Sequence, residues 1–183
     1  MQLGSDRTSI QVGADLIVFG HDDPLPMIRF SGLDRPETTT RKELKPAGVG
    51  REWFTTVSLE KNGSQPIIFL VSGSFYSGEM TAMVLAYDLE SETTMNVPDL
   101  NTARWDHINC IVGDYLCIVG GKDISGSFVN STELLDLTKL KDDWSGEKSG
   151  SSWSMIRDTF SQEILVPRIC CQLKYDQLLV MGF

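Results

Sequence analysis

Short apolar runs that end at glycine recur along the chain, at residues 16–20, 67–73, 116–121 and 178–182. Each run has the length of one β-strand, and apolar positions spaced as on one face of a helix are nearly absent. Gly, Pro, Asn and Asp separate the runs, as expected for turns. The first and third runs start 100 residues apart, since 116 − 16 = 100, and the second ends near the midpoint. The pattern therefore predicts an all-β fold built from a repeat of about 50 residues.

The third unit shows the expected order of elements most clearly. A first strand over residues 107–112 leads through a two-residue Gly-Asp turn into a second strand over residues 115–119. A polar loop over residues 122–127 then leads to a third strand. Such a turn places Cys110 opposite Cys117 across the hairpin, and we expect both to be reduced cysteines that pack as small apolar groups.

The second unit repeats the spacing of the third. Tyr87-Asp88 follows Gly73 as Leu135-Asp136 follows Gly121, because 87 − 73 and 135 − 121 both equal 14. A third strand that ends in an apolar residue and an aspartate is therefore predicted in both units.

The segment from residue 98 to residue 136 resembles the Kelch repeat. It contains Pro-Asp-Leu-Asn-Thr-Ala-Arg at 98–104, an alternating strand, the Gly-Asp turn, Leu-Cys-Ile-Val-Gly-Gly at 116–121, and the Leu-Asp third strand. The resemblance implies a Kelch-type β-propeller with about three and a half four-stranded antiparallel blades, an incomplete propeller. The implied blades are residues 7–46, 51–97, 104–157 and, truncated, 167–183.

The units depart from the Kelch pattern at specific positions. His21 replaces the second glycine of the first unit, and Ser72 replaces the first glycine of the second unit. The tryptophan expected before the fourth strand is Met95 in the second unit, and either Trp144 or Trp153 can fill that place in the third.

The length of the chain is short for this architecture. At about 50 residues a blade, 183 residues supply fewer than four blades, whereas propellers close with about 4–8. We therefore expect the sequence to be part of a longer protein whose further blades cover the apolar faces of the end blades.

The chain carries a net charge of −9. This charge opposes phosphate backbones and excludes nucleic acid as a partner, since binding it requires a basic surface. The charge serves solubility, or it favours basic segments of partner proteins. No apolar run approaches the roughly 20 residues of a membrane span, and residues 1–7 contain no apolar signal-peptide core, so we expect a cytoplasmic protein without membrane contact.

No catalytic motif is present in the sequence. The chain has no Gly-x-Ser-x-Gly, no phosphate-binding glycine loop and no His-Glu-x-x-His. It has two histidines, His21 and His107, and no Cys-x-x-Cys pair, so we expect neither a metal nor a cofactor. The prediction is therefore a protein that is not an enzyme. The alternative is part of a galactose oxidase-like propeller enzyme whose site lies outside this segment.

The Kelch resemblance implies a scaffold for protein–protein interaction. The most familiar role in that family is a substrate receptor of a ubiquitin ligase, joined to cullin-type components through other domains. By the same resemblance, partner contacts lie in two sets of loops. The loops after each glycine pair contribute His21, Asp22, Phe75, Tyr76, Lys122 and Asp123, and the loops before each first strand contribute Arg51, Trp53, Arg104, Trp105 and Arg168. Alternatively, these arginines and tryptophans bridge neighbouring blades.

Overall fold

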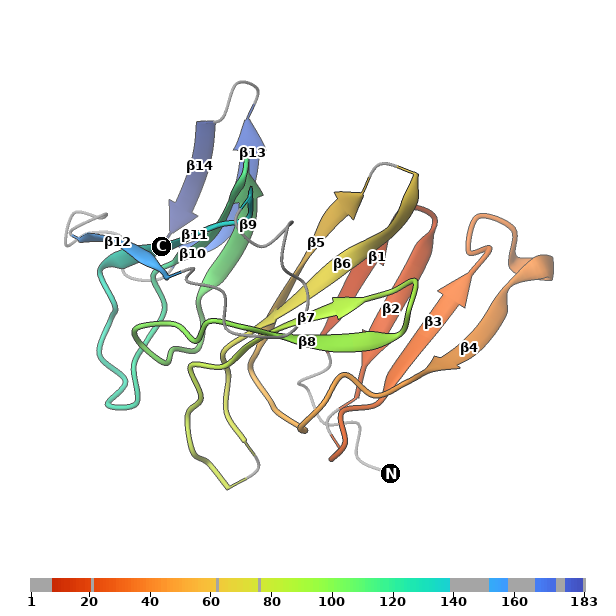
Figure 1. Cartoon of the computed structure of the whole chain (residues 1–183), viewed down its shortest axis with the longest axis horizontal. Coiled ribbons are helices and arrows are strands. Elements are labelled where there is room, and N and C mark those ends of the chain that lie inside the picture. The colour runs from red at the N-terminus through yellow and green to blue at the C-terminus, as the bar shows by residue number, and fades with distance from the viewer. Residues whose placement is uncertain are drawn as a thin grey trace.

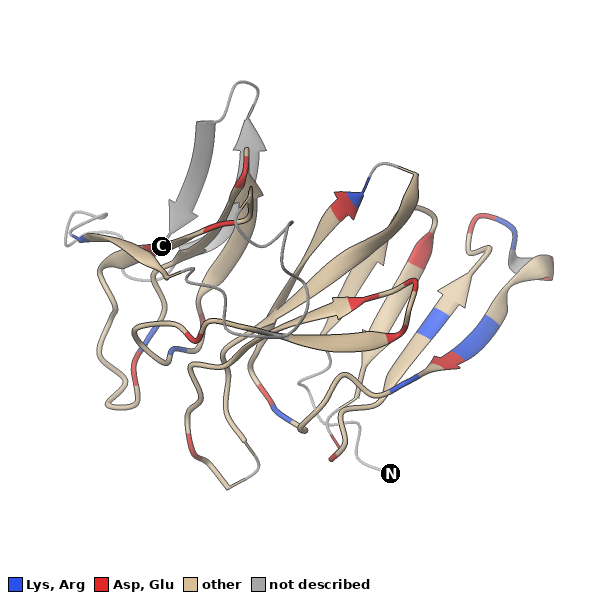
Figure 2. Cartoon of the chain, in the orientation of Figure 1, with Lys and Arg blue, Asp and Glu red and all other residues tan. Residues whose placement is uncertain are grey.

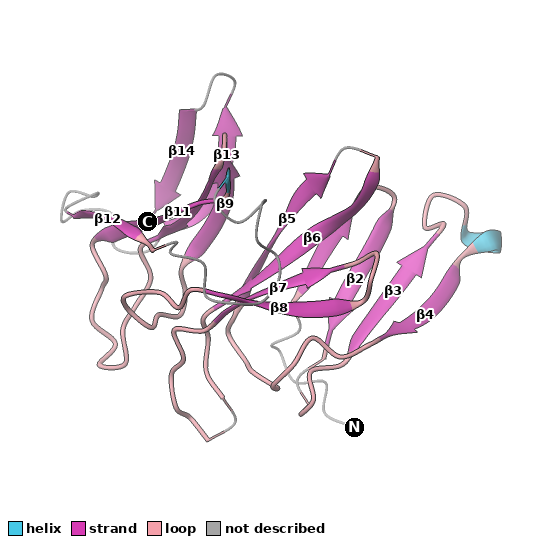
Figure 3. Ribbon diagram, in the orientation of Figure 1, coloured by secondary structure: helices cyan, strands magenta, loops and turns pink. Residues whose placement is uncertain are grey.

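The computed structural model consists almost entirely of β-strands (Figure 3). It describes residues 8–20, 22–61, 63–75, 77–138 and 152–157, and the backbone of two further strands at 167–173 and 177–182. The described part contains one short 3-10 helix, Pro36–Thr38, and hardly any other helical structure. No helix within these residues is long and apolar enough to cross a membrane. The predicted all-β class is confirmed.

The strands form three four-stranded antiparallel sheets and one two-stranded hairpin (Figure 1). The first sheet contains β1 (Ser9–Val12), β2 (Asp15–Phe19), β3 (Met27–Ser31) and β4 (Thr40–Leu44). The second contains β5 (Thr55–Lys61), β6 (Ser64–Val71), β7 (Val84–Asp88) and β8 (Thr93–Val97). The third contains β9 (Ile108–Val112), β10 (Tyr115–Val119), β11 (Ser131–Asp136) and β12 (Ser154–Arg157). The hairpin pairs β13 (Pro167–Leu173) with β14 (Gln177–Gly182).

In each four-stranded sheet, neighbours in the sequence are neighbours in the sheet. The apolar runs correspond to β2, β6, β10 and β14, which confirms the predicted second strands. The turn at Gly113, with φ of 57°, gives the predicted register, in which Cys110 lies opposite Cys117. Both cysteines are buried thiols, and the Cys117 thiol lies 3.7 Å from the carbonyl oxygen of Tyr115.

Among the side chains that the structure describes, two apolar cores lie between successive sheets. Phe19 and Met27 of the first sheet pack with Leu70 of the second sheet. On the opposite face of β6, Phe69 packs with Leu116 of the third sheet. Strand β6 therefore contributes alternate side chains to both cores, which explains why its sequence is continuously apolar rather than alternating.

Trp153 occupies the position before the fourth strand of the third sheet. It is buried in the second core, and its indole Nε1–H donates to the carbonyl oxygen of Pro98 at 2.7 Å. Of the two tryptophans that the sequence left open, Trp153 thus fills this place, and Trp144 lies outside the described residues.

Glycines that follow the second strands allow close backbone approach. At Gly73, with φ of 105°, a Cβ would lie 2.4 Å from the carbonyl oxygen of Glu52. At Gly121, with φ of 94°, a Cβ would lie 2.7 Å from the carbonyl oxygen of Trp105. Only glycine fits both the positive φ and the missing space.

Ser72 shows how the second unit tolerates its departure from glycine. It adopts a φ of 55°, and its hydroxyl oxygen lies 2.7 Å from the carbonyl oxygen of Thr81. The same oxygen accepts a hydrogen bond from the backbone N–H of Arg104 at 3.0 Å. A buried hydroxyl therefore links the second unit to the third, which offsets the conformational cost of a side chain at positive φ.

Candidate partner-binding site

Loops from the second and third units extend from the same edge of their sheets (Figure 1). Each unit forms two isolated antiparallel bridges there. In the second unit Ser74 pairs with both Glu52 and Met80, and in the third unit Lys122 pairs with both Trp105 and Phe128. The segment before the first strand and the two arms of the loop after the second strand are thereby held side by side.

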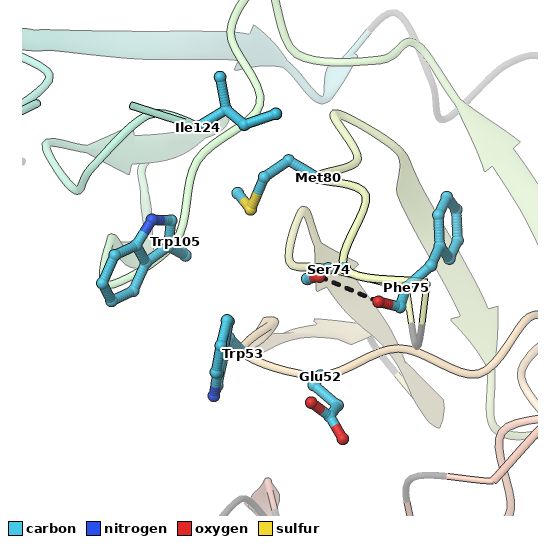
Figure 4. Close-up of a pocket in the computed structure, with 8 residues that line it drawn as sticks. Glu52, Trp53, Ser74, Phe75, Met80, Trp105 and Ile124 are labelled. Atoms are coloured by element: carbon cyan, nitrogen blue, oxygen red, sulfur yellow. Dashed lines mark hydrogen bonds between the residues drawn. The ribbon is translucent and has the colours of Figure 1, made fainter. Parts of the chain in front are cut away.

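A pocket of about 390 Å³ lies between these loops (Figure 4). It is bounded mainly by apolar and aromatic side chains, and the residues that line it are Glu52, Trp53, Ser74, Phe75, Gly78, Met80, Trp105 and Ile124. Three of the residues predicted to contact a partner line this pocket, namely Trp53, Phe75 and Trp105. The ring of Phe75 points away from the two indoles.

The two indoles form the aromatic wall of the pocket. The ring centroids of Trp53 and Trp105 are 5.7 Å apart, with 36° between the ring planes. The Trp105 indole Nε1–H donates to the carbonyl oxygen of Asp123 at 3.3 Å, which orients that ring. Trp53 has a φ of 54° and is 49% exposed. A large aromatic surface is therefore held in place and remains accessible to a ligand.

Lys122 lies against the outer part of this aromatic cluster. Its ammonium is 4.6 Å from the ring centroid of Trp105 and 5.6 Å from that of Phe128, within the range of cation–π attraction. It also forms an ion pair with the carboxylate of Asp106 at 3.4 Å. The ammonium is thus occupied by groups of its own unit.

The carboxylate of Asp123 organises the loop that follows. One of its oxygens accepts hydrogen bonds from the backbone N–H groups of Ser125 and Ser127, at 2.8 and 3.0 Å, and from the Ser125 hydroxyl at 2.6 Å. The hydrogen bond from the Ser125 hydroxyl is the largest cause of a lowered pKa of Asp123, and the backbone bonds add to it. This carboxylate fixes the shape of the loop.

Arg104 lies in the interior and is fully buried. Its guanidinium forms an ion pair with Glu133 and donates to the carbonyl oxygens of Gly120 and Ser131 at 3.0 and 3.3 Å. Glu133, also fully buried, accepts a hydrogen bond from the backbone N–H of Asn101 at 2.7 Å. This network ties the loop before β9 to strand β11.

Arg51 occupies the same position in the second unit and is also fully buried. It donates to the carbonyl oxygen of Met83 at 3.2 Å, and its Nε is buried without a hydrogen-bond partner. Strand register places Leu85 where the third unit has Glu133. Burial lowers the pKa of Arg51 to about 10, against the opposing charge of Asp99. Neither arginine presents its guanidinium to solvent.

His107 lies beneath the loop edge and is 3% exposed. Its Nε2 is 2.6 Å from the hydroxyl oxygen of Thr55 on the neighbouring sheet. Burial, and secondly the charge of Arg104, lower the pKa of His107 to about 3 from an ordinary value of 6.5. The imidazole is therefore neutral at physiological pH. No cluster of potential metal ligands occurs among the described residues.

Stability is expected to decrease on acidification because of His107. In the unfolded state the His107 imidazole binds a proton below about pH 6.5, whereas in the folded state it does so only near pH 3. The contribution of this group to stability is therefore complete above about pH 6.5 and is lost as the pH falls toward 3. Between pH 7 and pH 5 the free energy of unfolding should fall by about 2 kcal/mol from this group. Urea denaturation across this range measures it. The variant H107Q should show a shallower decline, and equal slopes for the two proteins would contradict the assignment.

The remaining candidate residues are placed as follows. Asp22 is exposed in the first unit, and its carbonyl oxygen approaches Gly50. His21 and Tyr76 lie outside the described residues. Arg168 belongs to β13, of which the structure describes only the backbone.

Sequence reasoning missed Glu52, Met80, Ile124 and Phe128. A spacing signal was available for two of them, because Met80 and Phe128 each lie seven residues after the glycine of their unit (80 − 73 and 128 − 121). Both form the second bridge of their loop, so the repeat marks the position although the residue types differ.

Comparison with known proteins finds similarity at the level of structure alone. No family model and no curated protein sequence matches the chain. A solved structure titled "Structure of YjhT" aligns with a TM-score of 0.58 and 12% sequence identity, over 82% of this chain and 51% of YjhT. The chain therefore shares its fold with YjhT and spans about half the length of that protein.

Proposed function

We propose that this chain is part of a Kelch-type β-propeller that binds other proteins through the loop edge described above. The repeat of about 50 residues and the sheets in sequential strand order support the architecture. The first strands of successive sheets also contact one another, as β1 does with β5, β5 with β9, and β9 with β13. Inner strands that meet around a common axis are a feature of propellers.

The observation that carries the binding function is the exposed aromatic wall formed by Trp53 and Trp105. Tryptophan is among the residues most enriched at interface hot spots, where it fills a desolvated pocket. The pocket has walls of Met80 and Ile124, and Ile124 is 77% exposed. Such an accessible apolar surface between ordered loops favours a protein segment as its occupant.

A role as the substrate receptor of a ubiquitin ligase follows from the Kelch resemblance alone and requires domains beyond this sequence. The enzyme alternative, a galactose oxidase-like propeller, has no specific support from this pocket, since none of its lining residues is a histidine, a tyrosine or a cysteine. We therefore favour the binding function.

Selection of peptides from a random phage-displayed library on the immobilised chain tests this function. Peptides enriched on the wild-type chain should bind the variant W53A at least about tenfold more weakly, as expected for an aromatic hot spot. The matched control is L33A, which removes another large exposed apolar side chain, in the turn after β3 of the first unit. Binding that survives W53A, or that L33A weakens equally, would contradict the assignment of this pocket.

A further inference from the structure

The pocket has a single charged residue in its lining, Glu52. This glutamate is partly buried beside Trp53, and Figure 4 shows its carboxylate directed away from Met80 and Ile124. Within the described part of the chain no ion pair involves its carboxylate. The negative charge at the edge of this apolar pocket therefore has no ion-pair partner among the residues that the structure describes.

The cations nearest in the sequence form no ion pair with Glu52 in the described part of the chain. Arg51 and Arg104 are fully buried, and the ammonium of Lys122 is already paired with Asp106. Glu79, on the loop that carries Met80, adds a further negative charge. Figure 2 shows both acidic and basic residues on the loops that extend from this edge. The charge in the pocket lining, that of Glu52, is thus complementary to a positively charged ligand group.

The aromatic wall fits the same ligand charge. The face of an indole attracts a cation placed within about 6 Å of its centroid. Lys122 already makes this contact with Trp105 at 4.6 Å, so a further cation is expected over Trp53, which is 49% exposed. Trp53 presents a second indole at 5.7 Å, and the side chains of Met80 and Ile124 are suited to pack against an aliphatic stem.

We infer that the partner segment inserts the side chain of an arginine or lysine into this pocket, with its stem against Met80 and Ile124 and its charge between Trp53 and Glu52. The inference rests on the proposed binding function and specifies the chemistry of the partner. It also gives the acidic net charge of −9 a role in recognition, because a basic segment is attracted over a longer range.

A series of three blocked peptides tests the inference on the unmodified chain. The probes are acetyl-Gly-Leu-X-Leu-Gly-amide with arginine, citrulline or glutamate at X, where citrulline keeps the shape of arginine without its charge. Binding is followed by NMR through the indole N–H resonances of Trp53 and Trp105, assigned with the variants W53F and W105F. The arginine peptide should bind about tenfold more tightly than the citrulline peptide, from combined cation–π and ion-pair attraction, and more tightly still than the glutamate peptide.

Two variants that each remove one negative charge distinguish the effect of the carboxylate in the pocket from the effect of the protein's overall charge. E52Q should weaken the arginine peptide about threefold and leave the citrulline peptide unchanged, whereas E79Q, which changes the net charge equally outside the pocket lining, should weaken it less than about 1.5-fold. Equal binding of the arginine and citrulline peptides overturns the inference, as does equal weakening by E52Q and E79Q. So does the absence of any indole shift up to about 5 mM peptide.

Failure of this inference is distinguishable from failure of the proposed function. If binding of the library-selected peptides requires Trp53 but does not require any basic residue of the peptide, the pocket binds proteins and the preference for a basic side chain is wrong. If W53A affects no selected peptide, the site itself is wrong.

Discussion

Replacing Glu133 with alanine is expected to lower the free energy of unfolding by about 3–5 kcal/mol, as for other buried ion pairs that lose one partner. The substitution leaves the fully buried guanidinium of Arg104 without a counter-charge. It also removes the acceptor for the backbone N–H groups of Asn101 and Thr102, which bond to the Glu133 carboxylate at 2.7 and 3.2 Å. Urea denaturation with a fixed m-value measures the loss.

Two controls define this result. E43A removes an exposed glutamate that pairs with Arg41 and should cost less than about 1 kcal/mol. The double variant R104M/E133L replaces the pair with apolar side chains and should recover more than half of the loss, because no isolated charge remains buried. A cost for E133A no larger than that for E43A would show that the pair is solvated.

The variant G73A is expected to lose about 3–5 kcal/mol, which combines the cost of a positive φ with overpacking against backbone. The added methyl group would lie 2.4 Å from the carbonyl oxygen of Glu52 and 2.9 Å from the backbone nitrogen of Phe54. The Glu52 carbonyl oxygen accepts the hydrogen bond from the Ser74 N–H at 2.8 Å, so it cannot move away without disturbing the bridge between these residues. Thermal or urea unfolding measures the effect on stability.

Gly126 provides the matched comparison for Gly73. It has a φ of 78°, but a Cβ there would meet no atom within 4 Å. G126A should therefore cost only the conformational term, about 1–2 kcal/mol. Equal losses for the two variants would mean that the close approach at Gly73 relaxes freely and that conformation alone requires glycine.

The strands were predictable from the sequence because the repeat reinforced weak local signals. An apolar run ending in glycine is common in β proteins, but its recurrence located β2, β6, β10 and β14. The facing of Cys110 and Cys117 followed from one two-residue turn, since a hairpin of known loop length has a fixed register.

The environment of the arginines was not predictable in the same way. Arg51 and Arg104 occupy equivalent positions, yet one meets a carboxylate and the other does not, because the partner position on the third strand is Leu85 in one unit and Glu133 in the other. That position is contributed by a strand about 30 residues away, so its alignment requires the register of two intervening strands. The pocket was partly predictable. The positions of its loops followed from the repeat, but the presence of Glu52, Met80 and Ile124 in its lining depended on how two units meet.

The alternation of β6 between two cores has a consequence for folding. Ile68 and Leu70 belong to the first core, whereas Ile67, Phe69 and Val71 belong to the second. Separation of the first sheet would expose the β6 side chains of the first core to solvent, and separation of the third sheet would expose those of the second core. The backbone amides of β6 should therefore exchange with solvent only when both neighbours have come apart, and they should be the slowest of the chain. A cut on either side of the middle sheet would yield no autonomous fragment, since that sheet holds its neighbours in a single cooperative transition.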